Sequence, residues 1–187
     1  MKNIGNTRNG DIHPETAKGL LDYLLPHAYR QGTTRRVFDV NGGDYTFSFG
    51  STVADKELWG QPKVVKVACR YESGQILGIM NNIREWEVWS DVRTNPELAR
   101  WFCPVVEISD CGRYLMMVKC QPAKIEDIPQ QIPSFLKDVH LDNWGVLHWE
   151  GKTRVVMIDY GHMQAKLIPD SWEMENYHNV IDEETIG

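Results

Sequence analysis

The sequence predicts an α+β fold in which antiparallel β-hairpins accompany one main helix. Two pairs of strand-like segments carry this prediction, 36–40 with 45–49 and 104–108 with 114–118. Each pair is separated by residues that favour tight turns. The main helix is predicted over residues 78–92, where apolar side chains recur at helical spacing. Strand-rich stretches on both sides of a single helix therefore lead to this fold class.

The N-terminal region is predicted to begin with a helix over residues 13–30. Pro14 suits a first helical turn, and Ala17 and the four leucines that follow it fall on one face. Pro26 is expected to end or kink this helix. The first hairpin comes next, and the Asn-Gly-Gly sequence at 41–43 is expected to form its turn.

The elements that follow are predicted from local composition. Residues 50–61 are expected to form a surface loop, and the valine-rich segment 63–68 a strand. Asn95 is expected to cap a short helix, with the next residue, a proline, in the first helical position. At 121–133 the composition shifts to Pro, Gln, Ile and acidic residues, which indicates a connector. The last expected elements are a hairpin of residues 145–148 and 154–158 and, in the acidic final twenty residues, at most one short helix.

Composition narrows the range of functions. The chain has 187 residues, enough for one domain, and 42% of them are hydrophobic, which fits a packed core. The net charge of −6 argues against a protein that coats nucleic acid, because such proteins normally carry a basic stripe. The four cysteines include no Cys-x-x-Cys pair, so we expect neither a zinc site nor a disulfide framework. With no long apolar run and no signal peptide, we expect a soluble cytoplasmic protein that binds no membrane.

The most informative polar residues follow the connector. Asp138 precedes Asn143 by five positions, and a predicted strand then ends in Ile-Asp-Tyr-Gly, whose aspartate is Asp159. This pattern supplies one carboxylate that can orient a hydroxyl and two side chains that can hold Mg²⁺ against ATP. Upstream, Lys66 lies within the predicted valine-rich strand. Lys63, three positions earlier, would point to the opposite face of that strand.

A lysine on a buried strand is expected to pair with an acidic side chain, and a neighbouring helix can supply one. Two candidates, Glu85 and Glu87, lie in the predicted main helix. The residues three, four and seven positions after Glu85 are two valines and a tryptophan, whereas those after Glu87 are serine, aspartate and threonine. Because an inward-facing glutamate should share its face with apolar residues, the pattern favours Glu85. The alternative is that both glutamates are solvated on an exposed face.

With these residues in this order, the chain resembles the protein-kinase-like superfamily. In size it resembles compact, atypical members of bacterial or phage type, such as bacteriophage host-takeover kinases. The resemblance implies a bilobal kinase-like fold in a single domain over 1–187, with an antiparallel β N-lobe that carries one main helix at about 1–118 and a truncated C-lobe at 119–187. It also implies ATP and Mg²⁺ as cofactors and a serine/threonine kinase activity toward a protein substrate.

The resemblance assigns a role to each polar residue. Lys66 is expected to grip the α- and β-phosphates, and Glu85 to hold Lys66 in place. Asp138 would act as the catalytic aspartate at the acceptor hydroxyl, while Asn143 and Asp159 would bind Mg²⁺. The superfamily's usual His-Arg before the catalytic aspartate is replaced here by leucine and lysine. That departure weakens the likeness to eukaryotic-type kinases more than the likeness in fold.

Two further segments are expected to contact the nucleotide. Backbone groups from about Val118 to Cys120 would form the hinge that bonds the adenine edge, although an ordinary buried strand also fits this segment. The phosphate loop would have a single glycine, with charge added by Arg35 or Arg36. Its residues would be Gly32, Thr33 and Thr34. An ordinary entry into a strand is an equally good interpretation of that loop.

Other functions stay open at this point. A cluster of histidines and aspartates could form a metal site for hydrolysis, although no His-Glu-x-x-His spacing occurs. Its members would be Asp138, His140, Asp142, Asp159 and His162. Nucleotidyl transfer to a protein hydroxyl is another possibility that sequence cannot separate from phosphotransfer.

A binding function is the main alternative to an enzyme. Few residues follow Asp159, so the lobe that would select a substrate is short. The chain could instead be a kinase-like binding module that inhibits a host protein, in the host cytoplasm if the chain is viral. A homodimer would cover the short lobe, and aromatic side chains there could meet a partner. The candidates are Trp144, Trp149 and Trp172.

Overall fold

The structure is a computed structural model, and it describes residues 2–4, 28–31, 34–40, 45–47, 50–52, 58, 60–69, 78–149 and 151–178. The chain divides into two compact units. The first contains Met1–Trp86 and Pro104–Lys119, and the second contains Glu87–Cys103 and Cys120–Gly187. Each unit is described by itself below.

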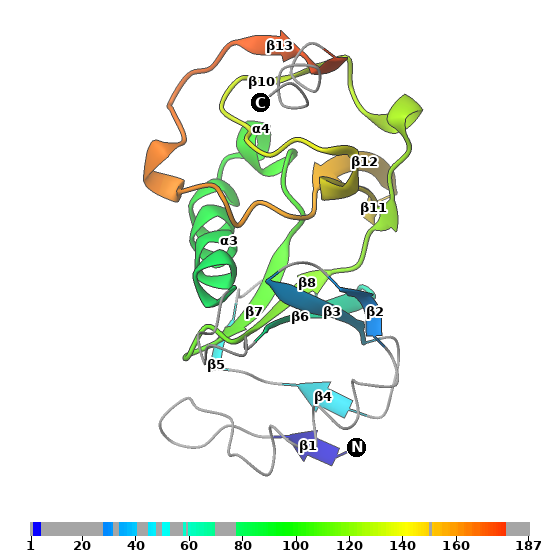
Figure 1. The fold of residues 1–187 in the computed structure, drawn as a ribbon, viewed down its shortest axis with the longest axis vertical. Helices are drawn as coiled ribbons and strands as arrows, with labels where there is room; N and C mark the ends of the chain where they lie inside the picture. The colour runs from blue at the N-terminus through cyan, green and yellow to red at the C-terminus, as the bar shows by residue number, and fades with distance from the viewer. Residues whose placement is uncertain are drawn as a thin grey trace. The chain divides into compact units, whose positions relative to one another are not determined.

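The first unit is built on a six-stranded sheet in which all neighbouring strands are antiparallel (Figure 1). The strand order is β2-β3-β6-β8-β7-β5. The bounds are β2 Ala28–Gln31, β3 Arg35–Asp39, β5 Gly50–Thr52, β6 Lys63–Ala68, β7 Val105–Ser109 and β8 Tyr114–Val118. A separate parallel pair joins β1, Lys2–Ile4, to β4, Tyr45–Phe47.

Strand β6 lies inside this sheet, between β3 and β8. Its sequence, Lys-Val-Val-Lys-Val-Ala, is rich in β-branched residues, and all of it after the first lysine is buried. Lys66 lies opposite Val37 on one side and Leu115 on the other. Because directly opposed side chains share a face, Lys66 emerges from an apolar surface of the sheet.

The main helix, α3, spans Ile79–Val92, and residues 79–86 of it belong to the first unit. It begins immediately after Gly78, whose φ of +94° is a conformation that other residues rarely adopt. A Cβ at position 78 would lie 2.6 Å from the carbonyl oxygen of Thr34. Glycine is therefore required where the chain enters the helix. The short helix α4, Pro96–Ala99, is capped by Asn95, whose side chain accepts a hydrogen bond from the Glu97 amide.

The second unit contains a three-stranded sheet of order β12-β11-β9 and a small two-stranded sheet that pairs β10 with β13. The strands are β9 Gln121–Pro122, β10 Gln131–Pro133, β11 Trp144–Trp149, β12 Lys152–Met157 and β13 Met174–Asn176. Three 3₁₀ turns connect them, η2 Ile125–Asp127, η3 Leu141–Asn143 and η4 Ala165–Leu167. Buried aromatic side chains pack in this unit, among them Phe102, Trp144, Tyr160 and Tyr177.

The predicted α+β class with mostly antiparallel sheets is confirmed. The strand at 63–68, the helix at 78–92 and the capped helix after Asn95 form within a residue of their predicted bounds. The two later hairpins also form, as β7 with β8 and β11 with β12. These segments have strong periodicity and turns with glycine at positive φ, so local sequence determines them.

The first predicted hairpin is wrong. Strand β3 pairs with β2 and β6, whereas β4 pairs with β1, so the two described strands are not partners of each other. The expected turn at 41–43 lies outside the described residues. The helix predicted over 13–30 also lies outside them, except for residues 28–30, which form part of β2 and are not helical.

Four short strands lie in segments for which the sequence predicts a loop, a connector or at most one short helix. Strand β5 interrupts the expected loop at 50–61, β9 and β10 lie within the expected connector at 121–133, and β13 lies in the C-terminal segment. Each is two or three residues long, which is too short to show an alternating pattern. Their pairing partners are remote in sequence, so only the folded chain defines them. In the described parts of the chain, no helix has the length and apolar character needed to cross a membrane.

Candidate functional site

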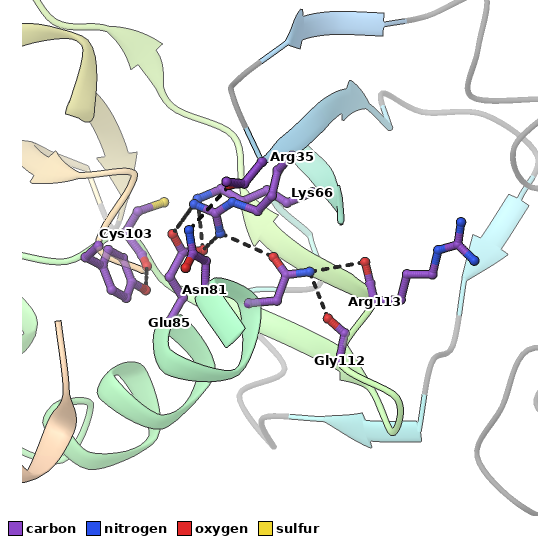
Figure 2. A network of polar contacts seen from close by, with 10 residues as sticks. Arg35, Lys66, Asn81, Glu85, Cys103, Gly112 and Arg113 are labelled. Carbon is purple, nitrogen blue, oxygen red and sulfur yellow. Dashed lines mark hydrogen bonds and ion pairs between the residues drawn. The ribbon is translucent and has the colours of Figure 1, made fainter. Parts of the chain in front are cut away.

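Lys66 and Glu85 form a buried ion pair in the first unit (Figure 2). The Lys66 ammonium nitrogen lies 2.9 Å from each carboxylate oxygen of Glu85. Glu85 is 0% exposed and Lys66 is 5% exposed. The contact predicted between the strand lysine and the helix glutamate is therefore confirmed, and its role toward a nucleotide stays a prediction.

Helical periodicity chose the correct glutamate. Glu85 is buried, whereas Glu87 is exposed. The residues three, four and seven positions after Glu85 are buried as well, namely Val88, Trp89 and Val92. An amphipathic helix thus directs one carboxylate into the interior and leaves its neighbour in solvent.

Arg35 is a second cation on the same carboxylate. Its Nη2 atom lies 2.9 Å from Oε1 of Glu85, and its Nη1 atom lies 2.9 Å from Oε2. Arg35 is 4% exposed. The sequence suggested this arginine only as added charge for a phosphate loop. In the structure, Arg35 lies on β3 two residues before Val37, and since Val37 lies opposite Lys66, Arg35 and Lys66 share a face of the sheet.

Asn82 extends this network to the turn between β7 and β8. Asn82 lies three residues before Glu85 on α3, so the two side chains project from the same face of the helix, about one turn apart. Its side-chain oxygen accepts a hydrogen bond from Arg35 at 3.2 Å, and its amide nitrogen donates to the carbonyls of Gly112 and Arg113 at 2.9 and 3.1 Å. These bonds tie the helix to both β3 and the β7–β8 turn (Figure 2).

Only one residue of the expected phosphate loop can be located. Gly32 and Thr33 lie outside the described residues. The Thr34 carbonyl accepts a hydrogen bond from the Cys69 amide at 2.9 Å, and its hydroxyl accepts one from the Asn81 side chain at 3.4 Å. Thr34 therefore anchors the entry into β3.

The expected hinge uses two of its backbone N–H groups within the fold. The Val118 amide donates to the Pro104 carbonyl at 3.0 Å, and the Lys119 amide donates to the Pro62 carbonyl at 2.8 Å. The Lys119 ammonium group also pairs with the Asp39 carboxylate. A hydrogen bond from adenine to this segment would therefore have to use other backbone groups, such as those of the partly exposed Cys120.

In the second unit, Asn143 holds the loop of Asp138 next to the segment of Asp159. Its side-chain nitrogen donates to the Asp138 carbonyl at 2.7 Å. Its own carbonyl accepts a hydrogen bond from the Ile158 amide, also at 2.7 Å. Since Ile158 directly precedes Asp159, one asparagine connects the two aspartates that were predicted to act together.

Asp138 has a conformation that is uncommon for any residue other than glycine. Its φ is +57°, the only positive φ among the described non-glycine residues. Its carboxylate oxygens lie 3.5 Å from Nε2 of His140 and 3.6 Å from Nε2 of His162. Both histidines are more than half exposed, and the Asp138 side chain is 31% exposed. The carboxylate is thus accessible at its site, and a strained backbone at an accessible carboxylate is typical of functional positions.

The residues on both sides of Asp159 are anchored. Ile158 is held by Asn143, as described above, and Tyr160 is buried with its hydroxyl donating to the Cys103 carbonyl at 2.8 Å. The Tyr160 ring also packs edge-on against Phe102, with ring centroids 5.1 Å apart. The backbone of Asp159 is therefore fixed between two well-packed neighbours.

Asn143 and Asp159 are the candidate metal ligands of this unit. The Asn143 amide nitrogen is a hydrogen-bond donor to Asp138, so its side-chain oxygen is the atom that would bind a metal. An amide oxygen together with the Asp159 carboxylate gives the oxygen donors that Mg²⁺ prefers. For the alternative hydrolytic site, the described part of the chain contains no group of three or more His, Cys, Asp or Glu side chains placed to hold a metal ion.

Two ionisable groups in the first unit are shifted by burial. Burial lowers the pKa of Lys63, whose ammonium group donates to the Gln61 carbonyl at 2.9 Å. Burial also raises the pKa of the Tyr114 hydroxyl. Lys63 and Lys66 thus have different partners, as expected for side chains on opposite faces of β6.

Comparisons with protein families, with curated proteins and with solved structures found no match for this chain. The function must therefore be inferred from the candidate site residues, which form one group in each unit. Lys66 and Glu85 belong to the first unit, whereas Asp138, Asn143 and Asp159 belong to the second.

Proposed function

We propose that the chain is an Mg-ATP-dependent phosphotransferase with a compact, atypical protein-kinase-like fold. The observation that carries the proposal is the buried ion pair between Lys66 on β6 and Glu85 on α3. A buried ion pair is expensive to desolvate, so it is weak as a device for stability alone. A lysine oriented by a helix glutamate is, in contrast, a requirement of kinase catalysis.

The second unit supports the same proposal. Asn143 links the Asp138 loop to the segment of Asp159, which brings one potential base and two potential metal ligands into one network. In the first unit, strand β8 leads into the expected hinge and pairs directly with β6, the strand that carries Lys66.

In the proposed reaction, Asp138 accepts the proton of the acceptor hydroxyl. The hydroxyl oxygen attacks the γ-phosphorus of ATP, a new P–O bond forms, and the bond to the β-phosphate oxygen breaks to release ADP. We expect the positive φ of Asp138 and the bond from Asn143 to its carbonyl to restrict the orientation of the carboxylate. Fixed orientation is what makes a carboxylate effective as a general base.

Lys66 binds the phosphates in this proposal, and Glu85 keeps its ammonium group in position. Arg35 positions Glu85 in turn by pairing with its carboxylate, and Asn82 accepts a hydrogen bond from Arg35. When Mg²⁺ is bound, it neutralises charge on the phosphates, and Asn143 and Asp159 are the residues that would hold it.

The proposed acceptor is a serine or threonine hydroxyl of a protein, for example a host protein if the chain is viral. We place the proposed activity in the cytoplasm, because it depends on ATP and because all four cysteines are thiols. Transfer of the nucleotidyl group instead of the γ-phosphate would use the same residues, and labelled ATP separates the two reactions.

Mg-ATP is expected to stabilise the wild-type protein against unfolding by about 2.7 kcal/mol at 100 times its Kd. The Lys66→Met variant should lose most of this stabilisation at the same ligand concentration, because it lacks the group that binds the phosphates. Its fold should survive, since Arg35 still pairs with Glu85. The measurement is thermal unfolding of each protein with and without Mg-ATP.

Lys63→Met is the matched control, because it removes the same charge from the same strand at a position with a different partner. It should respond to Mg-ATP like the wild type. Equal stabilisation of Lys66→Met and Lys63→Met by Mg-ATP would contradict the proposed role of Lys66.

A kinase-like binding module is the second candidate function, and exposed apolar side chains favour it. Four of the exposed large hydrophobic residues lie in the second unit, namely Ile125, Leu141, Leu167 and Met174. Two of the three tryptophans suggested by the sequence are less suitable, since Trp144 is buried and Trp172 packs edge-on against Phe135 with ring centroids 5.3 Å apart. Trp149 is partly exposed. A protein that binds Mg-ATP and transfers no phosphate would support this second function.

A further inference from the structure

Two cysteines that are separated by 17 positions in sequence touch each other in the second unit. The sulfur atoms of Cys103 and Cys120 lie 3.4 Å apart. Both are thiols, Cys103 is buried and Cys120 is partly exposed. We propose that this pair is a modification site, at which a hydroperoxide forms a reversible disulfide between Cys103 and Cys120.

The backbone of Cys103 is fixed on both sides. Its amide donates to the Met157 carbonyl at 2.9 Å, and its carbonyl accepts a hydrogen bond from the Tyr160 hydroxyl at 2.8 Å. The isolated bridge between Phe102 and Met157 adds to this attachment. The backbone that carries the Cys103 sulfur is therefore held in place by hydrogen bonds at both its amide and its carbonyl.

Cys120 is held against β11 by a close backbone approach at Gly145. A Cβ at position 145 would lie 2.6 Å from the Cys120 Cβ and 2.8 Å from the Ile158 side chain, so only glycine leaves room for the cysteine. Strand β9 begins at the next residue, Gln121, and pairs with β11. Both cysteines are thus anchored while their sulfur atoms remain in contact.

A small movement completes the bond. The sulfur atoms of a disulfide are about 2.05 Å apart, so the two thiols must approach by about 1.3 Å. Side-chain rotation can supply such a movement without a change in the backbone. Neither Cys69 nor Cys111 has a cysteine contact of this kind among the described residues.

Formation of the disulfide proceeds in two steps. The thiolate of the more accessible Cys120 attacks one oxygen of the hydroperoxide, which breaks the O–O bond and gives a sulfenic acid and an alcohol, or water if the oxidant is hydrogen peroxide. The Cys103 thiol then attacks the sulfenic sulfur and expels water. In total, two thiols lose two electrons and two protons, and the peroxide is reduced by the same amount. Thiol reductants reverse the bond by exchange.

The position of the pair gives the modification a consequence. One segment of the second unit ends at Cys103, and its next segment begins at Cys120. The residues between them, Pro104–Lys119, belong to the first unit. A disulfide would therefore join covalently the two points at which the chain passes from one unit to the other. This inference does not depend on the proposed phosphotransfer, although Cys120 belongs to the segment expected to bind adenine.

The test is a peptide map of the folded protein after treatment with hydrogen peroxide. Free thiols are blocked by alkylation, and the protein is digested without reduction and analysed by mass spectrometry. We expect a cross-linked pair of peptides joined through Cys103 and Cys120, which disappears after treatment with dithiothreitol. The Cys111→Ser variant, which removes an exposed thiol outside the pair, should give the same cross-link.

The Cys103→Ser variant checks the order of the two steps. In it, Cys120 should remain as a sulfenic acid that dimedone traps. The proposal is overturned if peroxide oxidises the exposed Cys111 in the wild type while no Cys103–Cys120 cross-link forms. Cross-links from Cys120 to Cys69 or Cys111 in equal yield would overturn it as well, because they would reflect unspecific oxidation.

Discussion

Replacing Glu85 with glutamine is expected to lower the free energy of unfolding by about 3–5 kcal/mol, the usual effect of removing one partner from a buried ion pair. The substitution preserves the shape of the side chain and removes its charge. Lys66 and Arg35 would both lose the carboxylate that they share inside the protein. Urea unfolding, monitored by the circular dichroism of the sheet and helix, measures the loss.

Glu87→Gln provides the control for this experiment. The same chemical change two residues along the helix, on an exposed side chain, should alter stability by no more than about 0.5 kcal/mol. The double variant Lys66→Met with Glu85→Gln should be more stable than the sum of the single losses predicts, because the removed groups are partners. Equal small effects at positions 85 and 87 would show that the ion pair is not formed in solution.

Replacing Asp138 with asparagine is expected to reduce phosphoryl transfer by about 10²–10⁴-fold, the contribution that a positioned general base usually makes. Asparagine keeps the size of the side chain and tolerates the positive φ at this position, so the fold should be retained. ATP binding should be preserved, since the proposal assigns the phosphates to Lys66. Initial rates of transfer, together with calorimetric titration of ATP, measure both properties.

Asp170→Asn is a suitable control, since Asp170 is an exposed aspartate of the same unit with no proposed role. Its transfer rate should match that of the wild type. If Asp138→Asn retained the full rate while Asp170→Asn behaved normally, Asp138 would not be the base, and the proposed mechanism would need another acceptor for the proton.

The lysine and its glutamate could be predicted from sequence because each lies in a strongly patterned element. A run of valines identifies β6, and helical spacing of buried residues distinguishes Glu85 from Glu87. Asp138 and Asn143 could be proposed from their spacing alone. The structure adds a reason for that spacing, because the 3₁₀ turn between them returns the asparagine side chain to the Asp138 carbonyl.

Arg35 and the cysteine pair could not be predicted in the same way. Arg35 reaches Glu85 only because β3 and β6 pair in a register that places Val37 opposite Lys66, and the sequence does not specify that register. Cys103 and Cys120 meet only because Cys103 is hydrogen-bonded to β12 while Cys120 precedes β9, which pairs with β11. Contacts of this kind depend on tertiary structure and leave no periodic signal.

The first hairpin shows the converse error. An Asn-Gly-Gly turn between two apolar runs is a strong local signal, and it predicts a hairpin that joins 36–40 to 45–49. In the fold, β3 instead lies between β2 and β6, so both of its edges are occupied. A strand with two partners inside a sheet can be assigned only when all its possible neighbours are known.

The most direct test of the proposed function is label transfer from ATP. Purified wild-type protein and the Asp159→Asn variant are incubated with Mg²⁺, a bacterial lysate and ATP labelled at either the γ- or the α-phosphate. We predict that the wild type transfers the γ-label to protein, that the variant does not, and that the α-label stays in the nucleotide. Transfer of the α-label would indicate nucleotidyl transfer, and binding of ATP without transfer would indicate a binding module. A protein that neither transfers label nor binds Mg-ATP would contradict the proposed site as a whole.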